Sequence, residues 1–365
     1  MSEWQTFCLK DLVKIFGGST PPTNNPKNYG NKIRWITAKD LSTLQGRYIK
    51  KGSRSISRLG FKSCSTFLLP KHAILFSVRA PIGYTAIISK RSCTDRGLMG
   101  LVPNKKIYFE FLYYLLKYHK HNISNMGVGT TFKGISKPAL GLFQVKIPPT
   151  YYEQQKIART LSILDQKIEN NHKINELLHN LAHKVYEYYF KYKPKNAKLE
   201  QIIIENPKSN IMVKNAQKTQ DKYPFFTSGD NILSYPKAII DGRNCFLNTG
   251  GNAGIKFYVG KASYSTDTWC ICANEFSDYL YLLLSSIKNH INQSFFQGTS
   301  LKHLQKNLLK KYPIYMPSVH EIKKFNQIMM PLLTLISINT RASKKLEQIR
   351  DFLLPLLLKQ QVKPQ

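Results

Sequence analysis

Two stretches of this chain carry the same helical pattern, and this repeat constrains the fold more than any other feature. Between residues 153 and 192, apolar side chains recur every three or four positions, the spacing of a coiled-coil stripe. The stripe returns in the second half of the chain, where Asn339 repeats the polar break at Asn171 and Glu321 repeats the acidic start at Glu153. Two stripes in one register indicate an internal duplication. The predicted seam comprises Ile157, Leu161, Leu164, Ile168, Asn171, Leu178, Val185, Phe325, Met329, Leu332, Ile336, Asn339, Leu346 and Leu353.

The blocks before and between these helices repeat as well. Trp35 returns as Phe225 and Leu75 returns as Phe246, but the interval between the two positions is much longer in the first copy. The additional residues follow Asp40, in a basic stretch that contains no acidic residue as far as Ala73. Two domains that share one fold but carry different basic segments would suit the recognition of two different half-sites of one target. A solvated surface insertion explains the additional residues equally well.

The repeat predicts an α+β fold with pseudo-two-fold symmetry. Residues 1–150 and 196–319 would form two α/β domains, and residues 151–195 and 320–365 would form two long helices, the second with a tail. The two helices are expected to pair antiparallel as a coiled coil that separates the domains. Asn171 and Asn339 would disfavour slipped pairings if they lie inside the seam, although a tilted seam would expose them instead.

The charge of the chain points to a polyanionic partner. The net charge is +33, and residues 1–152 hold 24 Lys and Arg against 5 Asp and Glu. Because the excess lies mostly in the first block, concentrated binding faces are expected, with the helices nearer to a solvated scaffold. No apolar run of 18 residues occurs and the first residues show no signal pattern, so a cytoplasmic protein without a membrane span is expected.

No catalytic constellation stands out in the sequence. There is no phosphate-binding GxxxxGK[ST] loop, and the six cysteines and nine histidines lack the spacing of metal ligands. We therefore expect a binding protein that has no metal or cofactor of its own. A nuclease or methyltransferase in its own right is a weaker alternative, because catalytic triads are set by spatial geometry that sequence spacing does not exclude.

Seven short motifs are spread over essentially the whole chain: Gly129 to Ser136, Ile147-Pro148-Pro149, Glu153 to Ile157, Trp35 to Leu41, Arg79 to Gly83, Tyr223 to Gly229 and Thr249 to Gly251. Together they resemble the specificity subunit of type I restriction–modification enzymes. The chain departs from that family's pattern in the segments before the two helices: Pro149 to Glu153 is one residue longer than usual, and the second copy has Glu321-Ile322 in place of Glu-Gln.

The resemblance implies a non-catalytic subunit that reads double-stranded DNA, each α/β domain recognising one half of a split target. It implies that two methyltransferase subunits dock beside the helices and that restriction and translocase subunits add to that complex. S-adenosylmethionine, ATP and Mg²⁺ would belong to those partners, as would adenine methylation on a flipped base. The competing interpretation is an orphan DNA-binding protein or coiled-coil adaptor without a restriction partner.

Most basic residues at a DNA interface contact phosphates, and a minority read base edges, where Arg suits guanine and Asn suits adenine. We choose candidates from the basic stretch of the first block and from the corresponding positions of the second. The predicted DNA contacts are Arg47, Lys50, Lys51, Arg54, Arg58, Arg79, Lys237, Arg243, Asn244, Asn252 and Lys256.

Overall fold

The computed structural model describes residues 3–129, 133–216 and 222–364, which form two compact units. Unit 1 comprises residues 1–170 and 343–365, and unit 2 comprises residues 171–342. Each unit therefore combines one α/β domain with one half of each long helix. The division differs from the four predicted segments, because each domain packs on the helix halves next to it and shares a core with them.

Each long helix is continuous over 40 residues, α7 from Tyr151–Phe190 and α12 from Val319–Leu358. In unit 2 the rings of Phe190 and Phe325 lie 4.9 Å apart, and the Asn339 side chain donates to that of Asn175 at 2.9 Å. The end of one helix half therefore packs against the start of the other. This antiparallel pairing and the α+β class agree with the fold predicted from the repeat.

The residues of the predicted seam differ in burial and in partners. Several of its apolar residues, such as Ile157 and Phe325, belong to the cores that the helices share with the domains. Asn339 donates a hydrogen bond to Asn175, a residue outside the predicted seam, while Asn171 is half-buried. Asn175 also donates to the Ile336 carbonyl and the Thr340 hydroxyl, both at 3.3 Å. The buried members are Ile157, Leu161, Ile168, Phe325, Met329 and Ile336, and the half-buried members are Leu164, Leu178, Val185, Leu332, Leu346 and Leu353.

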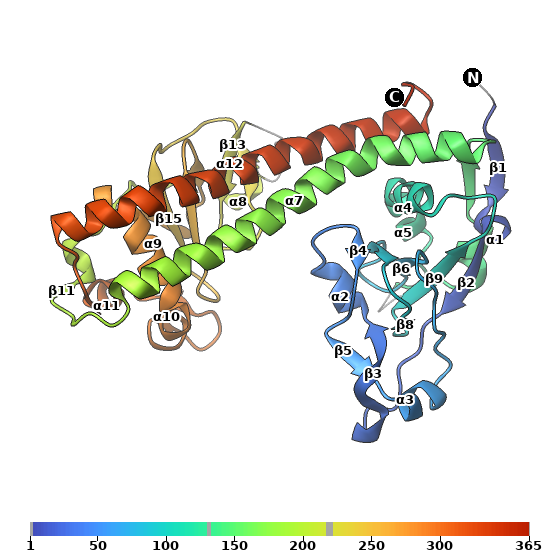
Figure 1. Cartoon of the computed structure of the whole chain (residues 1–365), viewed down its shortest axis with the longest axis horizontal. Coiled ribbons are helices and arrows are strands. Elements are labelled where there is room, and N and C mark those ends of the chain that lie inside the picture. Colours follow the sequence, from blue (N-terminus) through green and yellow to red (C-terminus); the bar gives the residue numbers. More distant parts are fainter. Residues whose placement is uncertain (1–2, 130–132, 217–221, 365) are drawn as a thin grey trace. The chain divides into compact units, whose positions relative to one another are not determined.

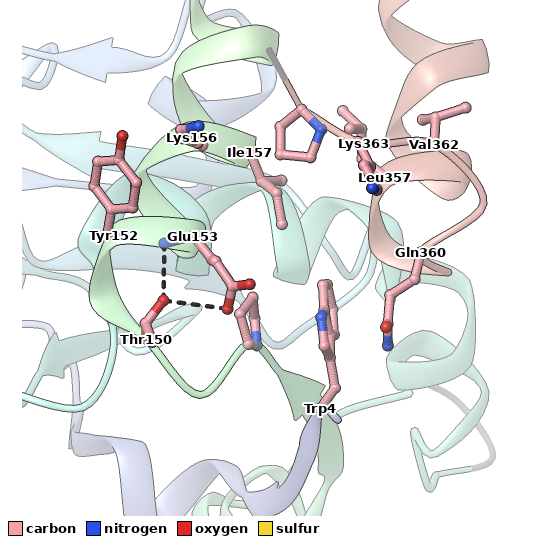
Figure 2. A pocket seen from close by; sticks show the side chains of 12 residues that line it. Trp4, Thr150, Tyr152, Glu153, Lys156, Ile157, Leu357, Gln360, Val362 and Lys363 are labelled. Atoms are coloured by element: carbon pink, nitrogen blue, oxygen red, sulfur yellow. Dashed lines mark hydrogen bonds between the residues drawn. The ribbon is translucent and has the colours of Figure 1, made fainter. Parts of the chain in front are cut away.

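The acidic residue at the start of each stripe caps its helix. The Thr150 hydroxyl accepts from the Glu153 N–H at 3.2 Å and donates to the Glu153 carboxylate at 3.1 Å, beside a pocket of 510 Å³ in unit 1 (Figure 2). At α12, hydrogen bonds from the Ser318 N–H and the Tyr315 hydroxyl lower the pKa of Glu321 to about 2. Thr150 and Ser318 each stand three residues before their acid, and Pro149 and Pro317 each stand four residues before it, so the two copies have the same length at this point.

The α/β domain of unit 1 contains two main sheets. One has the strand order β2-β9-β6-β7-β4, and the other has the order β5-β3-β8. The strands are β1 (Gln5–Cys8), β2 (Val13–Gly17), β3 (Tyr29–Ile36), β4 (Tyr48–Ile49), β5 (Arg54–Ile56), β6 (Ile74–Ser77), β7 (Thr85–Ile88), β8 (Cys93–Thr94), β9 (Leu98–Pro103) and β10 (Gln144–Ile147). The helices are α1 (Leu9–Leu12), α2 (Ala38–Ser42), α3 (Arg58–Lys62), α4 (Phe109–Tyr118), α5 (Lys120–Asn125) and α6 (Lys137–Leu142).

Helix α4 joins this domain to the long helices. Its apolar residues from Phe111 to Leu116 are buried between the larger sheet and the start of α7 (Figure 1). The same core takes in Ile74 and Phe76 of β6, Ile157 and Leu161 of α7, and the α12 segment 354–358. Helix α4 therefore fixes the sheet to both long helices of unit 1.

Unit 2 repeats this plan. Its strands are β11 (Ala197–Lys198), β12 (Ile204–Glu205), β13 (Tyr223–Phe226), β14 (Leu233–Tyr235), β15 (Arg243–Asn248), β16 (Ile255–Val259), β17 (Ser263–Tyr264), β18 (Thr268–Cys272), β19 (Phe296–Gln297), β20 (His303–Leu304) and β21 (Pro313–Ile314). Its helices are α8 (Val213–Ala216), α9 (Ser277–Ser286), α10 (Lys288–Ser294) and α11 (Lys306–Lys310).

The strand orders match between the units. The order β12-β18-β15-β16 corresponds to β2-β9-β6-β7, and β14-β13-β17 corresponds to β5-β3-β8. In both small sheets the central strand pairs parallel to one neighbour and antiparallel to the other. Strand β4 and helix α3 belong to the segment that is longer in the first copy, and they have no counterpart among the described elements of unit 2.

Candidate nucleic-acid interface

A group of exposed basic side chains surrounds the small sheet of unit 1. Lys50, Lys51, Arg54 and Arg58 are exposed on β5, on the turn before it and at the start of α3. The Arg54 guanidinium lies 4.3 Å from the centre of the Tyr29 ring and 5.8 Å from that of the buried Trp35. Stacking on aromatic rings orients the planar guanidinium, a group that suits phosphates and guanine edges.

Two further basic residues belong to this surface and are absent from the predicted contacts. Lys32 and Arg34 are exposed on β3, alternating with the half-buried Ile33 and the buried Trp35. Arg34 pairs across the sheet with Ser55, one residue from Arg54. Alternation of basic and apolar residues within a strand is the signal that could have identified them.

Arg79 lies on the loop that follows β6. Its side chain is exposed, and its backbone forms a bridge with Gly134. This brings Arg79 beside the motif that runs from Gly129 to Ser136, of which residues 130–132 lie outside the described part of the chain.

Arg47 does not lie on this surface, contrary to its predicted role as a DNA contact. Its side chain is only 3% exposed and forms ion pairs with Glu110 at 3.1 Å and Glu169 at 3.2 Å. The Arg47 N–H also donates to Glu169 at 2.8 Å. The guanidinium therefore neutralises two carboxylates inside unit 1, one on α4 and one on α7, and its role is structural.

In unit 2 the predicted contacts Lys237 and Asn252 are exposed, in separate loops. Lys256 is half-buried, and its ammonium donates to the Thr227 carbonyl at 2.8 Å and to Asn248 at 3.2 Å. Burial lowers the pKa of Lys256. Asn252 and Lys256 both contact Asn248, whereas Lys237 lies in the loop before β15.

Arg243 and Asn244 are also misassigned as DNA contacts. The Arg243 guanidinium donates two hydrogen bonds, both of 2.6 Å, to the Asp278 carboxylate in a bidentate ion pair. It also donates to the Thr334 hydroxyl at 2.9 Å. Asp278 is 1% exposed and Asn244 is 2% exposed, and Asn244 accepts a hydrogen bond from Asn206 at 2.8 Å. Both residues fix β15 to the interior of unit 2 and do not present donors to a ligand.

The described residues contain no group of three or more His, Cys, Asp or Glu side chains placed to hold a metal ion. None of the helices in this part of the chain is long and apolar enough to cross a membrane.

Comparisons with known proteins agree with the duplicated architecture. The family model described as "Type I restriction modification DNA specificity domain" matches residues 1–180 and again residues 195–348. The specificity subunit of the type I restriction enzyme MjaIX from Methanocaldococcus jannaschii is 28% identical, with 98% of this chain and 93% of the relative covered. A putative type I specificity subunit from Mycoplasma genitalium is 24% identical, with 84% and 80% covered.

A solved structure shares the fold. The crystal structure of a type I restriction–modification S subunit from M. genitalium superposes with a TM-score of 0.65 at 18% identity, covering 98% of this chain and 96% of that one.

Proposed function

The chain belongs to the type I restriction–modification DNA specificity family, and from that premise we propose that each of its α/β domains reads one half of a bipartite DNA target. The observation that carries the proposal is the duplicated domain with unlike basic surfaces. Lys50, Lys51, Arg54 and Arg58 occupy a segment of unit 1 that is shorter in unit 2, so the two domains would meet DNA with different side chains. Different half-site sequences would follow.

The long helices would serve as the spacer between the half-sites. Each helix of 40 residues is about 60 Å long at 1.5 Å per residue, and each is continuous from one unit into the other. A paired helical spacer resists bending, as fixed half-site spacing requires. The hydrogen bonds of Asn175 and Asn339 would oppose a slipped register, because a shift by one turn would leave these amides without partners.

The helices would also dock methyltransferase subunits. On α7, within unit 2, Ile174, Leu177 and Leu181 are 43%, 69% and 47% exposed and recur at helical spacing. On α12, Ile328, Leu335 and Ile338 are 42%, 41% and 45% exposed and also lie at helical spacing. A stripe of exposed apolar residues on a helix suits an amphipathic helix of a partner.

Replacing Leu177 with glutamate is expected to weaken methyltransferase binding at least tenfold, because a charge would enter the apolar contact. Titration of the purified methyltransferase subunit into the full chain in a calorimeter measures this. Glu176→Gln, at the adjacent exposed position, is the control and should leave binding unchanged. If Leu177→Glu bound the methyltransferase as tightly as Glu176→Gln does, the exposed apolar stripe would not be part of the docking surface.

Replacing Arg54 with alanine is expected to weaken or relax recognition of one half-site only. A base contact costs about 1–3 kcal/mol, or roughly 5- to 150-fold in affinity, whereas a phosphate contact weakens all sequences alike. Competition binding with duplexes that carry one altered half-site distinguishes these results. Lys195→Ala, an exposed substitution beyond the end of α7, is the control. Equal loss with both altered duplexes would make Arg54 a phosphate contact and would contradict its role in reading one half-site.

We further propose that this chain performs no chemistry and that restriction and translocase subunits join the complex through the methyltransferases. S-adenosylmethionine, ATP and Mg²⁺ would then be bound by the partners. Incubating the pure chain with DNA, Mg²⁺ and a methyl donor tests this: cleaved or methylated DNA would show a catalytic activity in the chain itself.

A further inference from the structure

A groove of 690 Å³ opens on the side of unit 1 formed by α1, β2 and α6. Its floor consists of the buried residues Val13, Ile15 and Gly141, and the exposed Leu142 stands beside them. The exposed lysines Lys10, Lys14 and Lys137 line the same groove, which has no acidic residue in its lining. The groove therefore combines an apolar floor with a positively charged rim.

The equivalent place in unit 2 has side chains of different chemistry. The buried Leu9 and Leu140 correspond to the buried Leu199 and Leu309, which aligns the two sites residue by residue. In this alignment Glu205 takes the place of Ile15 and Lys310 takes the place of Gly141. Glu205 and Lys310 form an ion pair, and Glu205 also accepts from the Trp269 indole at 2.8 Å. Unit 2 therefore has a partly exposed ion pair at the positions where unit 1 has Ile15 and Gly141.

Packing does not explain the glycine at position 141. A Cβ atom added there would lie 3.5 Å from the Lys10 Cβ and 3.8 Å from the Ile15 Cδ1, which are ordinary van der Waals distances. The backbone does not have a positive φ at this residue. Glycine is a poor helix former, yet it stands within α6. Its missing side chain keeps the groove open.

We propose that this groove binds a segment of the methyltransferase subunit in which carboxylates flank an apolar side chain, a proposal that rests on the proposed function. The apolar side chain would sit over Ile15 and Gly141, and the carboxylates would pair with Lys10, Lys14 and Lys137. A DNA backbone fits less well, because phosphates gain nothing from an apolar floor. A second copy of the chain is disfavoured by its net charge of +33.

Two kinds of variant test the groove in the full chain. Gly141→Lys places the residue of unit 2 on the floor, and Gly141→Ala is its control because an added methyl group fits at ordinary contact distance. Lys14→Glu combined with Lys137→Glu reverses the rim charge. Lys311→Glu is the control for charge, because the exposed Lys311 of unit 2 corresponds to Leu142.

The purified methyltransferase subunit is titrated into each variant, and affinity for the DNA target is measured in parallel. Gly141→Lys and the double reversal are expected to weaken binding of the methyltransferase subunit that docks on unit 1 at least tenfold, while both controls bind as the wild type does and the DNA affinity of Gly141→Lys is unchanged. Unchanged methyltransferase binding in both groove variants would overturn the proposal. A loss of affinity confined to DNA would overturn it as well.

The outcome is separable from the proposed function. If the wild-type chain showed no preference between target and scrambled duplexes, DNA reading would fail as a function while the methyltransferase titration would still report on the groove. Circular dichroism spectra and unfolding midpoints of each variant establish that the variants are folded.

Discussion

Replacing Arg47 with alanine is expected to destabilise unit 1 by about 3–5 kcal/mol, because Glu110 and Glu169 would lose the cation that neutralises them. Arg47 is 3% exposed, so water would not replace its guanidinium without local opening. Hydrogen exchange followed by mass spectrometry should show faster exchange in α4 and in the unit 1 half of α7. Protection within residues 171–342 should be unchanged.

Lys50→Ala serves as the control for Arg47→Ala. Lys50 is exposed on the same segment, and its loss should change stability by less than about 0.5 kcal/mol. The pair of variants also separates the structural role of Arg47 from its predicted role as a DNA contact. A normally stable Arg47→Ala protein with weakened DNA binding would restore Arg47 to the DNA interface.

Raising the salt concentration from 50 to 200 mM is expected to weaken DNA binding by about 10³- to 10⁵-fold if roughly six to ten phosphates are neutralised. The net charge of +33 and the exposed lysines and arginines around the small sheet of unit 1 lead to this expectation. A plot of the logarithm of the binding constant against the logarithm of salt concentration measures it. The slope should fall by about one in Lys50→Ala if Lys50 contacts a phosphate.

Gln166→Ala, an exposed and uncharged position on α7, is the control for the slope. If the binding constant of the wild-type chain did not change with salt concentration, contacts to DNA phosphates would be contradicted. The positive charge of the chain would then need an explanation other than DNA binding.

The duplicated helices were predictable because their apolar residues recur at a regular helical spacing. A stripe such as Ile157, Leu161 and Ile168 has few alternatives to burial on a helix, and its repetition at a constant offset in the second half of the chain argues against chance. The matching strand orders follow from the same duplication, which the family match over residues 1–180 and 195–348 confirms. The partner of Asn339 was not predictable, because register between two helices depends on how the domains pack against them.

Individual contacts were less predictable because a basic residue in a sequence does not show which acid it faces. Arg47 lies in a segment without acids, yet Glu110 and Glu169 approach it from 63 and 122 residues away. Arg243 likewise forms its ion pair with Asp278, which lies 35 residues further along the chain. Arg54, in contrast, faces Tyr29 and Trp35 and forms no ion pair with an acid among the described residues. Its assignment as a DNA contact remains a prediction.

The ion pair between Arg47 and Glu169 has a consequence for hybrid proteins. The arginine lies within residues 1–150, but its acid lies on α7, beyond the end of that segment. A chimera joined at position 150 would take Arg47 from one parent and the residue at position 169 from the other parent. The crossover should therefore fall after Glu169, so that exchanging target preference does not also exchange half of a buried electrostatic pair.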